Sequence, residues 1–151
     1  MSATTTTTSR VLQDPPASVE AAHQHYVARL AVETDCADVA ADLADGIVDY
    51  TIVDVRGRHN YERAHVPGAL NAPSGMIDEH VAAALPAGPL VVYCWGPGCN
   101  GAHKAAFALT RHGRQVKEMI GGMEYWIREG QPIEGTSAEA LAARADHALV
   151  G

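Results

Sequence analysis

The chain has 151 residues, of which 47% are hydrophobic and 5% aromatic, so one domain with a single core is the expectation. Its formal net charge of −7 argues against a nucleic-acid partner, because phosphate binding requires a basic face. No apolar run reaches the roughly 18 residues of a membrane span, so no membrane contact is expected. Three cysteines form an odd set, which does not suggest a disulfide-stapled secreted scaffold.

The N-terminal residues 1–16 are rich in threonine and are expected to form a flexible leader. They contain neither a basic start nor an apolar segment, so a secretory signal is not expected. Together with a reactive thiol, this composition predicts a cytoplasmic location.

Helices and strands are predicted to alternate along the rest of the chain. A helix over Ala17–Val32 begins near the N-cap Ser18, and a second short helix covers Ala37–Ala44. Tyr50–Val55 and Leu90–Tyr93 are apolar without alternation, which indicates strands buried on both faces. The other predicted strands are Ala69–Asn71 and Val116–Ile120, and the other predicted helices are His59–Ala64, Ile77–Leu85, Ala102–His112, Met123–Arg128 and Ala138–Leu149.

This alternation predicts a parallel sheet, in which a ligand site lies beyond the carboxyl ends of the strands. Asp54 and Arg56 follow one strand and Cys94 follows another, so all three are expected at the same edge of the sheet. In the helix over Ala102–His112, Ala106, Phe107 and Leu109 are expected to face inward. Gly121 and Gly122 are expected to adopt positive φ, and Trp126 is expected in the core.

The loop after Cys94 has the sequence CWGPGCNG and leads into a helix. Because free backbone amides and a helix N-terminus stabilise a thiolate, Cys94 is predicted to be a nucleophile rather than an inert core cysteine. The amides predicted to bind the anion belong to Trp95, Gly96, Gly98, Cys99, Asn100 and Gly101.

Two further roles in this loop stay open. Cys99 is either a packing residue or a resolving thiol that attacks an oxidised Cys94 and closes a disulfide. Trp95 either packs or walls the site of the reactive sulfur. Cys36 lies far away in the sequence and is expected to be simply buried.

Charged residues near the loop could support the site. Asp54 and Arg56 are expected to form an ion pair, with Arg56 or Arg58 as the alternative ligand of an anionic substrate. His103 and Lys104 stand at the start of a helix, where cations are unfavourable unless an anion lies nearby. The eight histidines do not group with cysteines or carboxylates, so neither a metal ion nor a cofactor is expected.

Short motifs occur in a fixed order between residues 52 and 126: IVDVR at 52–56, YERAHVPGALN at 61–71, VVYC at 91–94 and IGGMEYW at 120–126. Together they resemble the rhodanese-like sulfurtransferase family, over about Thr34 to Ile133. The resemblance implies an α/β fold with a five-stranded parallel sheet and helices on both faces. It implies one rhodanese-like domain over residues 17–151, with its core at about 34–133.

The resemblance also implies an enzyme, a sulfurtransferase whose matching cysteine, Cys94, accepts a sulfane sulfur as a persulfide. The implied partners are a small sulfane-sulfur donor, a thiol or cyanide acceptor, and a protein sulfur carrier. Family members that use thiosulfate usually have an arginine directly after the cysteine, whereas Trp95 stands there and no Arg or Lys occurs before Lys104. A phosphatase is disfavoured, because position 100 is asparagine where that chemistry needs an arginine.

Two other functions remain open. One is a redox or persulfide-sensing module that cycles Cys94 and Cys99 between dithiol and disulfide. The other is a catalytically quiet interaction domain, which the presence of the cysteine disfavours.

Overall fold

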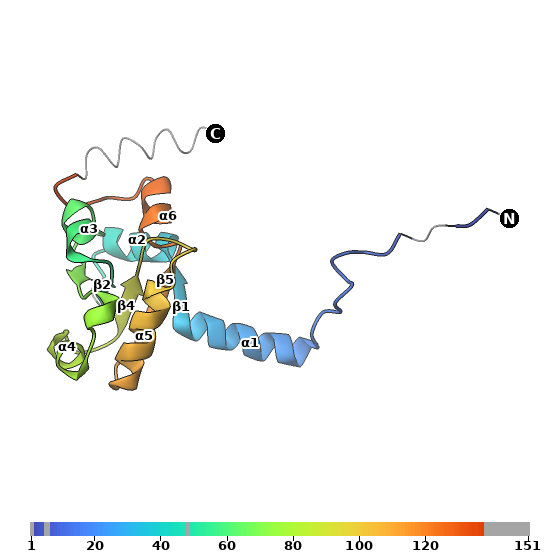
Figure 1. Cartoon of the computed structure of the whole chain (residues 1–151), viewed down its shortest axis with the longest axis horizontal. Helices are drawn as coiled ribbons and strands as arrows, with labels where there is room; N and C mark the ends of the chain where they lie inside the picture. The colour runs from blue at the N-terminus through green and yellow to red at the C-terminus, as the bar shows by residue number, and fades with distance from the viewer. Residues whose placement is uncertain (1, 5–6, 48, 138–151) are drawn as a thin grey trace. The chain divides into compact units, whose positions relative to one another are not determined.

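The computed structural model (Figure 1) describes residues 2–4, 7–47 and 49–137, so the predicted helix at Ala138–Leu149 lies outside the described residues. The chain separates into two compact units, Met1–Ala31 and Val32–Gly151. Whether residues 17–151 form one domain stays a prediction. Among the described residues, no helix is long and apolar enough to cross a membrane.

Most of helix α1 (Val19–Val32) belongs to the first unit. Its predicted start is confirmed, because the Ala21 amide donates a hydrogen bond of 3.2 Å to the Ser18 hydroxyl. No residue of α1 is buried, although the sequence contains a moderate apolar stripe.

The second unit contains a five-stranded parallel sheet with the strand order β1-β5-β4-β2-β3, which confirms the predicted fold class. Strand β1 (Glu33–Asp35) was not predicted, because its three residues include no apolar side chain. It is fixed by pairing with β5, where Thr34 lies opposite Met119. The other strands lie where the sequence predicted them: β2 (Thr51–Asp54), β3 (Leu70–Asn71), β4 (Leu90–Tyr93) and β5 (Val116–Ile120).

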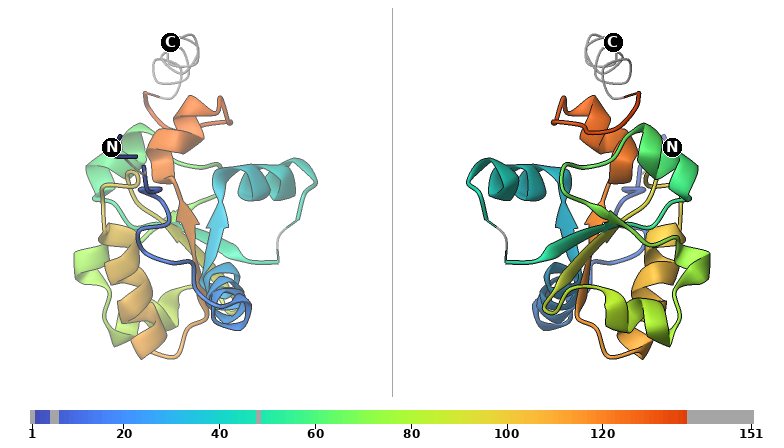
Figure 2. Two further views of the ribbon diagram at one scale, coloured as in Figure 1. Left: turned by 90° about the vertical axis from the view of Figure 1, so that its right-hand side faces the viewer. Right: turned by 90° about the vertical axis from the view of Figure 1, so that its left-hand side faces the viewer.

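Helices of the second unit cover both faces of this sheet, as predicted. Figure 2 shows α2 on one side of the sheet and α4 and α5 on the other. Asp78 delays the start of α4 relative to the prediction, because its carboxylate accepts a hydrogen bond from the Val81 amide at 2.9 Å. The helical elements are α2 (Cys36–Ala44), α3 (Arg58–Arg63), the 3₁₀ helix η1 (Ser74–Met76), α4 (Glu79–Ala84), α5 (Gly101–Arg111) and α6 (Gly122–Arg128).

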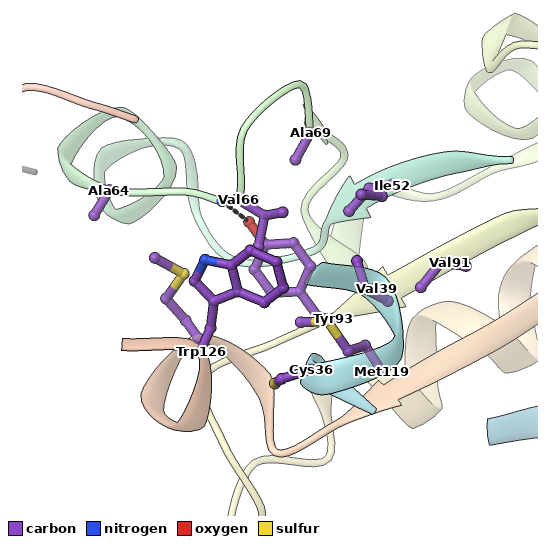
Figure 3. Close-up of a cluster of buried hydrophobic side chains, with 11 residues drawn as sticks. Cys36, Val39, Ile52, Ala64, Val66, Ala69, Val91, Tyr93, Met119 and Trp126 are labelled. Carbon is purple, nitrogen blue, oxygen red and sulfur yellow. Dashed lines mark hydrogen bonds between the residues drawn. The ribbon is translucent and has the colours of Figure 1, made fainter. Parts of the chain in front are cut away.

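The core has two parts because successive strand residues point to opposite faces of the sheet. Val91 and Tyr93 of β4 belong to one cluster, which Figure 3 shows together with Trp126, and Leu90 and Val92 belong to the other. Trp126 is fully buried, as predicted, and its indole N–H donates a 2.7 Å hydrogen bond to the Pro132 carbonyl.

One inward assignment in α5 was wrong. Phe107 is 69% exposed, whereas Leu109 is fully buried. Positions two residues apart lie on nearly opposite sides of a helix, so these two side chains cannot share a face. The buried face of α5 is instead formed by Gly101, Ala102, Ala105 and Leu109.

Candidate functional site

Cys94 lies at the carboxyl edge of the sheet, directly after the central strand β4. The neighbouring strand β2 pairs Asp54 with Tyr93, and the Val55 amide continues the ladder with a 3.0 Å bond to the Tyr93 carbonyl. Asp54, Arg56 and Cys94 therefore meet at one edge, as the sequence predicted. The Cys94 side chain is buried in the cluster on the α5 face, with 6% of the residue exposed.

The start of α6 fixes the backbone of the loop that follows Cys94. The Met123 amide donates to the Cys94 carbonyl at 2.9 Å, and the Glu124 amide donates to the Trp95 carbonyl at 2.7 Å. Gly122 allows this approach, because a Cβ atom there would lie 2.6 Å from the Cys94 carbonyl oxygen. Its φ of +61° confirms the predicted positive φ, as does the φ of +89° at Gly121.

The same loop folds back on itself and brings two thiols together. The Cys99 amide donates to the Gly96 carbonyl at 3.0 Å, which closes a turn through the Pro97–Gly98 segment. The Sγ atoms of Cys94 and Cys99 lie 2.7 Å apart, and both cysteines are free thiols. The spacing of the two cysteines in the sequence did not determine whether their sulfur atoms would lie this close together.

Backbone amides reach these sulfur atoms from two of the six predicted positions. The Trp95 amide lowers the pKa of both cysteines, and the Gly101 amide lowers that of Cys99. The Cys99 amide is used in the turn with Gly96. The Gly96 nitrogen lies against Gly122, where a Cβ atom would approach it to 2.8 Å.

The two thiols differ in pKa, and the sequence did not predict which of them has the lower value. Burial, as the main cause, and the hydrogen bond with Cys99, as the second, together raise the pKa of Cys94 to about 11. The pKa of Cys99 is lowered, because its hydrogen bond with Cys94 favours the ionised form and Lys104 adds positive charge nearby. Of the two thiols, Cys99 therefore ionises first as the pH rises, and the Cys94 thiol then donates the hydrogen bond between them.

Asp54 and Arg56 form the predicted ion pair, with 2.7 Å between Arg56 Nη2 and Asp54 Oδ2. Both residues are buried. The guanidinium also donates to the Ala64 carbonyl, and Asp54 accepts a further bond from the Arg56 amide at 2.9 Å. Removing one partner of this buried pair would leave the other charge uncompensated, so the two residues depend on each other at the edge of the sheet beside Cys94.

Trp95 covers this ion pair from the loop. Its ring lies 4.6 Å from the Arg56 guanidinium carbon, a cation–π contact, while 44% of the residue stays exposed. Arg58 is exposed and bonds Glu62 at 2.7 Å on its own helix. The Arg56 guanidinium is therefore engaged by Asp54, the Ala64 carbonyl and Trp95, and Arg58 is engaged by Glu62.

The two cationic residues at the start of α5 interact with different groups. His103 is largely exposed, and its Nδ1 lies 3.0 Å from Glu118 Oε1 of β5. Burial raises the pKa of Glu118, and the nearby imidazole opposes that shift. Lys104 instead acts on the loop through its effect on the pKa of Cys99.

Three contributions to the site were not predicted: the amides of Met123 and Glu124, which bind the loop backbone, and the Tyr93 hydroxyl, which donates to Asp54 Oδ2 at 2.8 Å. The glycine pair before Met123 was the only sequence signal for the first two. Within the described part of the chain, no group of three or more His, Cys, Asp or Glu side chains is placed to hold a metal ion.

Cys36 belongs to a different core cluster from the Cys94–Cys99 pair. It is buried, as predicted, and its thiol lies 3.6 Å from both the Ile120 and Gly122 carbonyls as a donor. Burial raises its pKa to about 12, which keeps it a neutral core residue.

Comparison with known proteins places this geometry in a family. The family model of the rhodanese-like domain matches residues 36–129 of this sequence, more than half of the chain. The structure of the BH2092 protein from Bacillus halodurans is similar with a TM-score of 0.77 and 40% identity, covering 81% of this chain and 90% of that one.

Two relatives of named function are more distant. The HTH-type transcriptional regulator Rv0324 of Mycobacterium tuberculosis is 34% identical over 86 residues, 57% of this chain and 38% of the regulator. This chain therefore spans less than half the length of that regulator. The thiosulfate sulfurtransferase GlpE of Pseudomonas paraeruginosa is 29% identical over 89 residues, 59% of this chain and 79% of that enzyme. The fold, the ordered motifs and the match over residues 36–129 show that this chain belongs to the rhodanese-like domain family.

Proposed function

We propose that this chain is a sulfurtransferase in which Cys94 carries the transferred sulfur as a persulfide. The observation that carries the proposal is the placement of the Cys94 sulfur at the end of the central strand, against Gly101 at the start of α5. Membership of the rhodanese-like family and the similarity to GlpE enzymes, which are named thiosulfate sulfurtransferases, support it.

Transfer takes two displacement steps. The Cys94 thiolate attacks the sulfane sulfur of a donor, the bond between that sulfur and the rest of the donor breaks, and the donor remnant leaves with the electron pair. A thiol or cyanide then attacks the outer sulfur of the persulfide, and Cys94 leaves as a thiolate.

The loop binds the negative persulfide through backbone dipoles. The amides of Trp95 and Gly101 supply partial positive charge at the sulfur atoms. The Arg56 guanidinium is buried and paired with Asp54, so it does not bring a full positive charge to a donor. This favours a singly charged donor, such as an organic persulfide or the persulfide of a carrier protein, over a dianion. A reactive thiol pair of this kind fits a reducing compartment such as the cytoplasm.

A persulfide-sensing module is the second candidate. The 2.7 Å between the two Sγ atoms favours it, and one relative is named a transcriptional regulator. The two candidates differ in turnover, since a sensor reacts once and an enzyme reacts repeatedly.

Two measurements with thiosulfate or an organic persulfide as donor test the proposal. One is the turnover of donor and acceptor, and the other is the mass of the intact chain after incubation with the donor. The wild-type chain and Cys36→Ala are expected to turn over donor and acceptor. Cys94→Ser is expected to lose turnover and to gain no sulfur atom, because only a thiolate carries sulfane sulfur. Undiminished turnover of Cys94→Ser would assign the chemistry to another residue.

A further inference from the structure

The Cys94 and Cys99 sulfur atoms form a packed pair whose position is set by their surroundings. Gly101 makes room for them, because a Cβ atom there would lie 2.7 Å from Cys94 Sγ and 3.4 Å from Cys99 Sγ. The turn between the Cys99 amide and the Gly96 carbonyl holds the second thiol in place. The space at Gly101 and the turn in the loop therefore fix the positions of both sulfur atoms.

The two thiols are unequal in exposure. Cys94 is buried, whereas Cys99 is partly exposed and has Lys104 nearby. A sulfur atom added to Cys94 would therefore stand next to a thiol that ionises more readily than Cys94 itself.

We propose that Cys99 discharges the Cys94 persulfide within the chain, which releases hydrosulfide and leaves a Cys94–Cys99 disulfide. This inference rests on the proposed function, since it requires a persulfide on Cys94. It makes the internal thiol the first acceptor and hydrosulfide the product, so that the chain acts as a reductase of sulfane sulfur.

The step balances without any added oxidant. The Cys99 thiol passes its proton to the outer sulfur of the Cys94 persulfide anion and attacks Cys94 Sγ as a thiolate. The new bond joins Cys94 Sγ to Cys99 Sγ, and the bond between Cys94 Sγ and the outer sulfur breaks, so that hydrosulfide leaves with the electron pair. The sulfane sulfur is reduced and the two cysteine sulfurs are oxidised. An external dithiol then reduces the disulfide by exchange and restores both thiols.

Proximity gives this step its advantage over external acceptors. Groups held in reacting position show effective concentrations far above those of free thiols in solution. The ring closed by the disulfide spans residues 94–99 only, so closing it adds little loop entropy. The in-line path requires the outer sulfur to lie on the side of Cys94 Sγ away from Cys99.

A single-turnover experiment on the reduced full chain, freed of reductant, tests the inference with thiosulfate or an organic persulfide as donor. The wild type is expected to release up to one equivalent of hydrosulfide per chain and to become lighter by two hydrogen atoms. The Cys99→Ser chain is expected to release none and to stay one sulfur atom heavier, with that sulfur on Cys94. Adding a dithiol should then free hydrosulfide from this variant and allow repeated turnover of the wild type.

The outcomes separate this inference from the proposed function. A wild-type chain that stays one sulfur atom heavier and releases no hydrosulfide overturns the internal discharge but leaves the Cys94 persulfide intact. Failure of both wild type and Cys99→Ser to take sulfur from either donor overturns both. Cys36→Ala is the matched control, because it also removes one thiol and is expected to behave like the wild type.

Discussion

Tyr93 and Asp54 face each other as register partners in β4 and β2, and their side chains are also joined. The Tyr93 hydroxyl donates a 2.8 Å hydrogen bond to Asp54 Oδ2 and accepts one of 3.0 Å from the Val66 amide, which Figure 3 marks. Burial and the Asp54 charge raise the pKa of Tyr93, so the hydroxyl stays a donor. A buried polar network therefore holds the backbone from which Cys94 emerges.

Removing this hydroxyl is expected to destabilise the fold. Tyr93→Phe leaves the Val66 amide without its acceptor and Asp54 with one donor fewer, which costs about 1–3 kcal/mol in the free energy of unfolding. Urea denaturation measures the loss. Tyr125→Phe is the control, because it removes the same atom from a residue that is 44% exposed. Equal stability of the two variants would show that the buried network contributes nothing.

The space beside the two sulfur atoms is expected to be essential for sulfur transfer. Gly101→Ala places a Cβ atom 2.7 Å from Cys94 Sγ, so the sulfur must move. We expect kcat/KM for sulfur transfer to fall roughly tenfold or more, which corresponds to about 1.4 kcal/mol of lost transition-state stabilisation. Gly98→Ala is the control in the same loop, because a Cβ atom there meets no atom within 4 Å. Similar kcat/KM values for the two variants would show that the sulfur position is not critical.

Alkylation is expected to modify Cys99 before Cys94 as the pH rises. Only the thiolate reacts, so the thiol with the lower pKa reacts at the lower pH. The pKa of Cys99 lies below its ordinary value of 9.0, whereas that of Cys94 is raised to about 11. Peptide mapping after iodoacetamide treatment at stepped pH values measures the order.

In Cys99→Ala the alkylation profile of Cys94 is expected to shift to lower pH. The variant removes the hydrogen bond and the negative charge of Cys99, both of which raise the pKa of Cys94. Cys36 serves as the internal reference, since burial raises its pKa to about 12 and it should stay unmodified while the chain is folded. Modification of Cys94 ahead of Cys99 in the wild type would contradict the assigned order.

Thiosulfate is expected to be a poor donor compared with its use by a family member that has arginine after the cysteine. Trp95 follows Cys94 here and Arg56 is paired with Asp54, so a charge-assisted bond to the dianion is missing. Such a bond contributes about 1.5–3 kcal/mol, which is roughly tenfold to over a hundredfold in kcat/KM. Steady-state kinetics with thiosulfate and cyanide, run on both enzymes, measure the ratio. Equal kcat/KM values would show that the loop amides suffice.

The sequence alone determined the order of most elements and the edge of the sheet at which Cys94 lies. Unbroken apolar runs marked β2 and β4, and the carboxyl ends of parallel strands necessarily meet at one edge. The predicted helix over Ala102–His112 agrees with α5 to within one residue at each end, and Gly113 just beyond it has a φ of +79°. These features depend on local composition and periodicity, which a single chain records directly.

Only the tertiary structure decided how side chains from different elements meet. Strand β1 has no apolar signal and exists because β5 offers it a partner. The separation of Cys94 and Cys99 depends on a turn within the loop and on the missing side chain of Gly101. The order of their pKa values follows from unequal burial, since desolvation raises the pKa of the more buried thiol. Burial and distance arise from packing, so sequence spacing could name these residues but not their relationship.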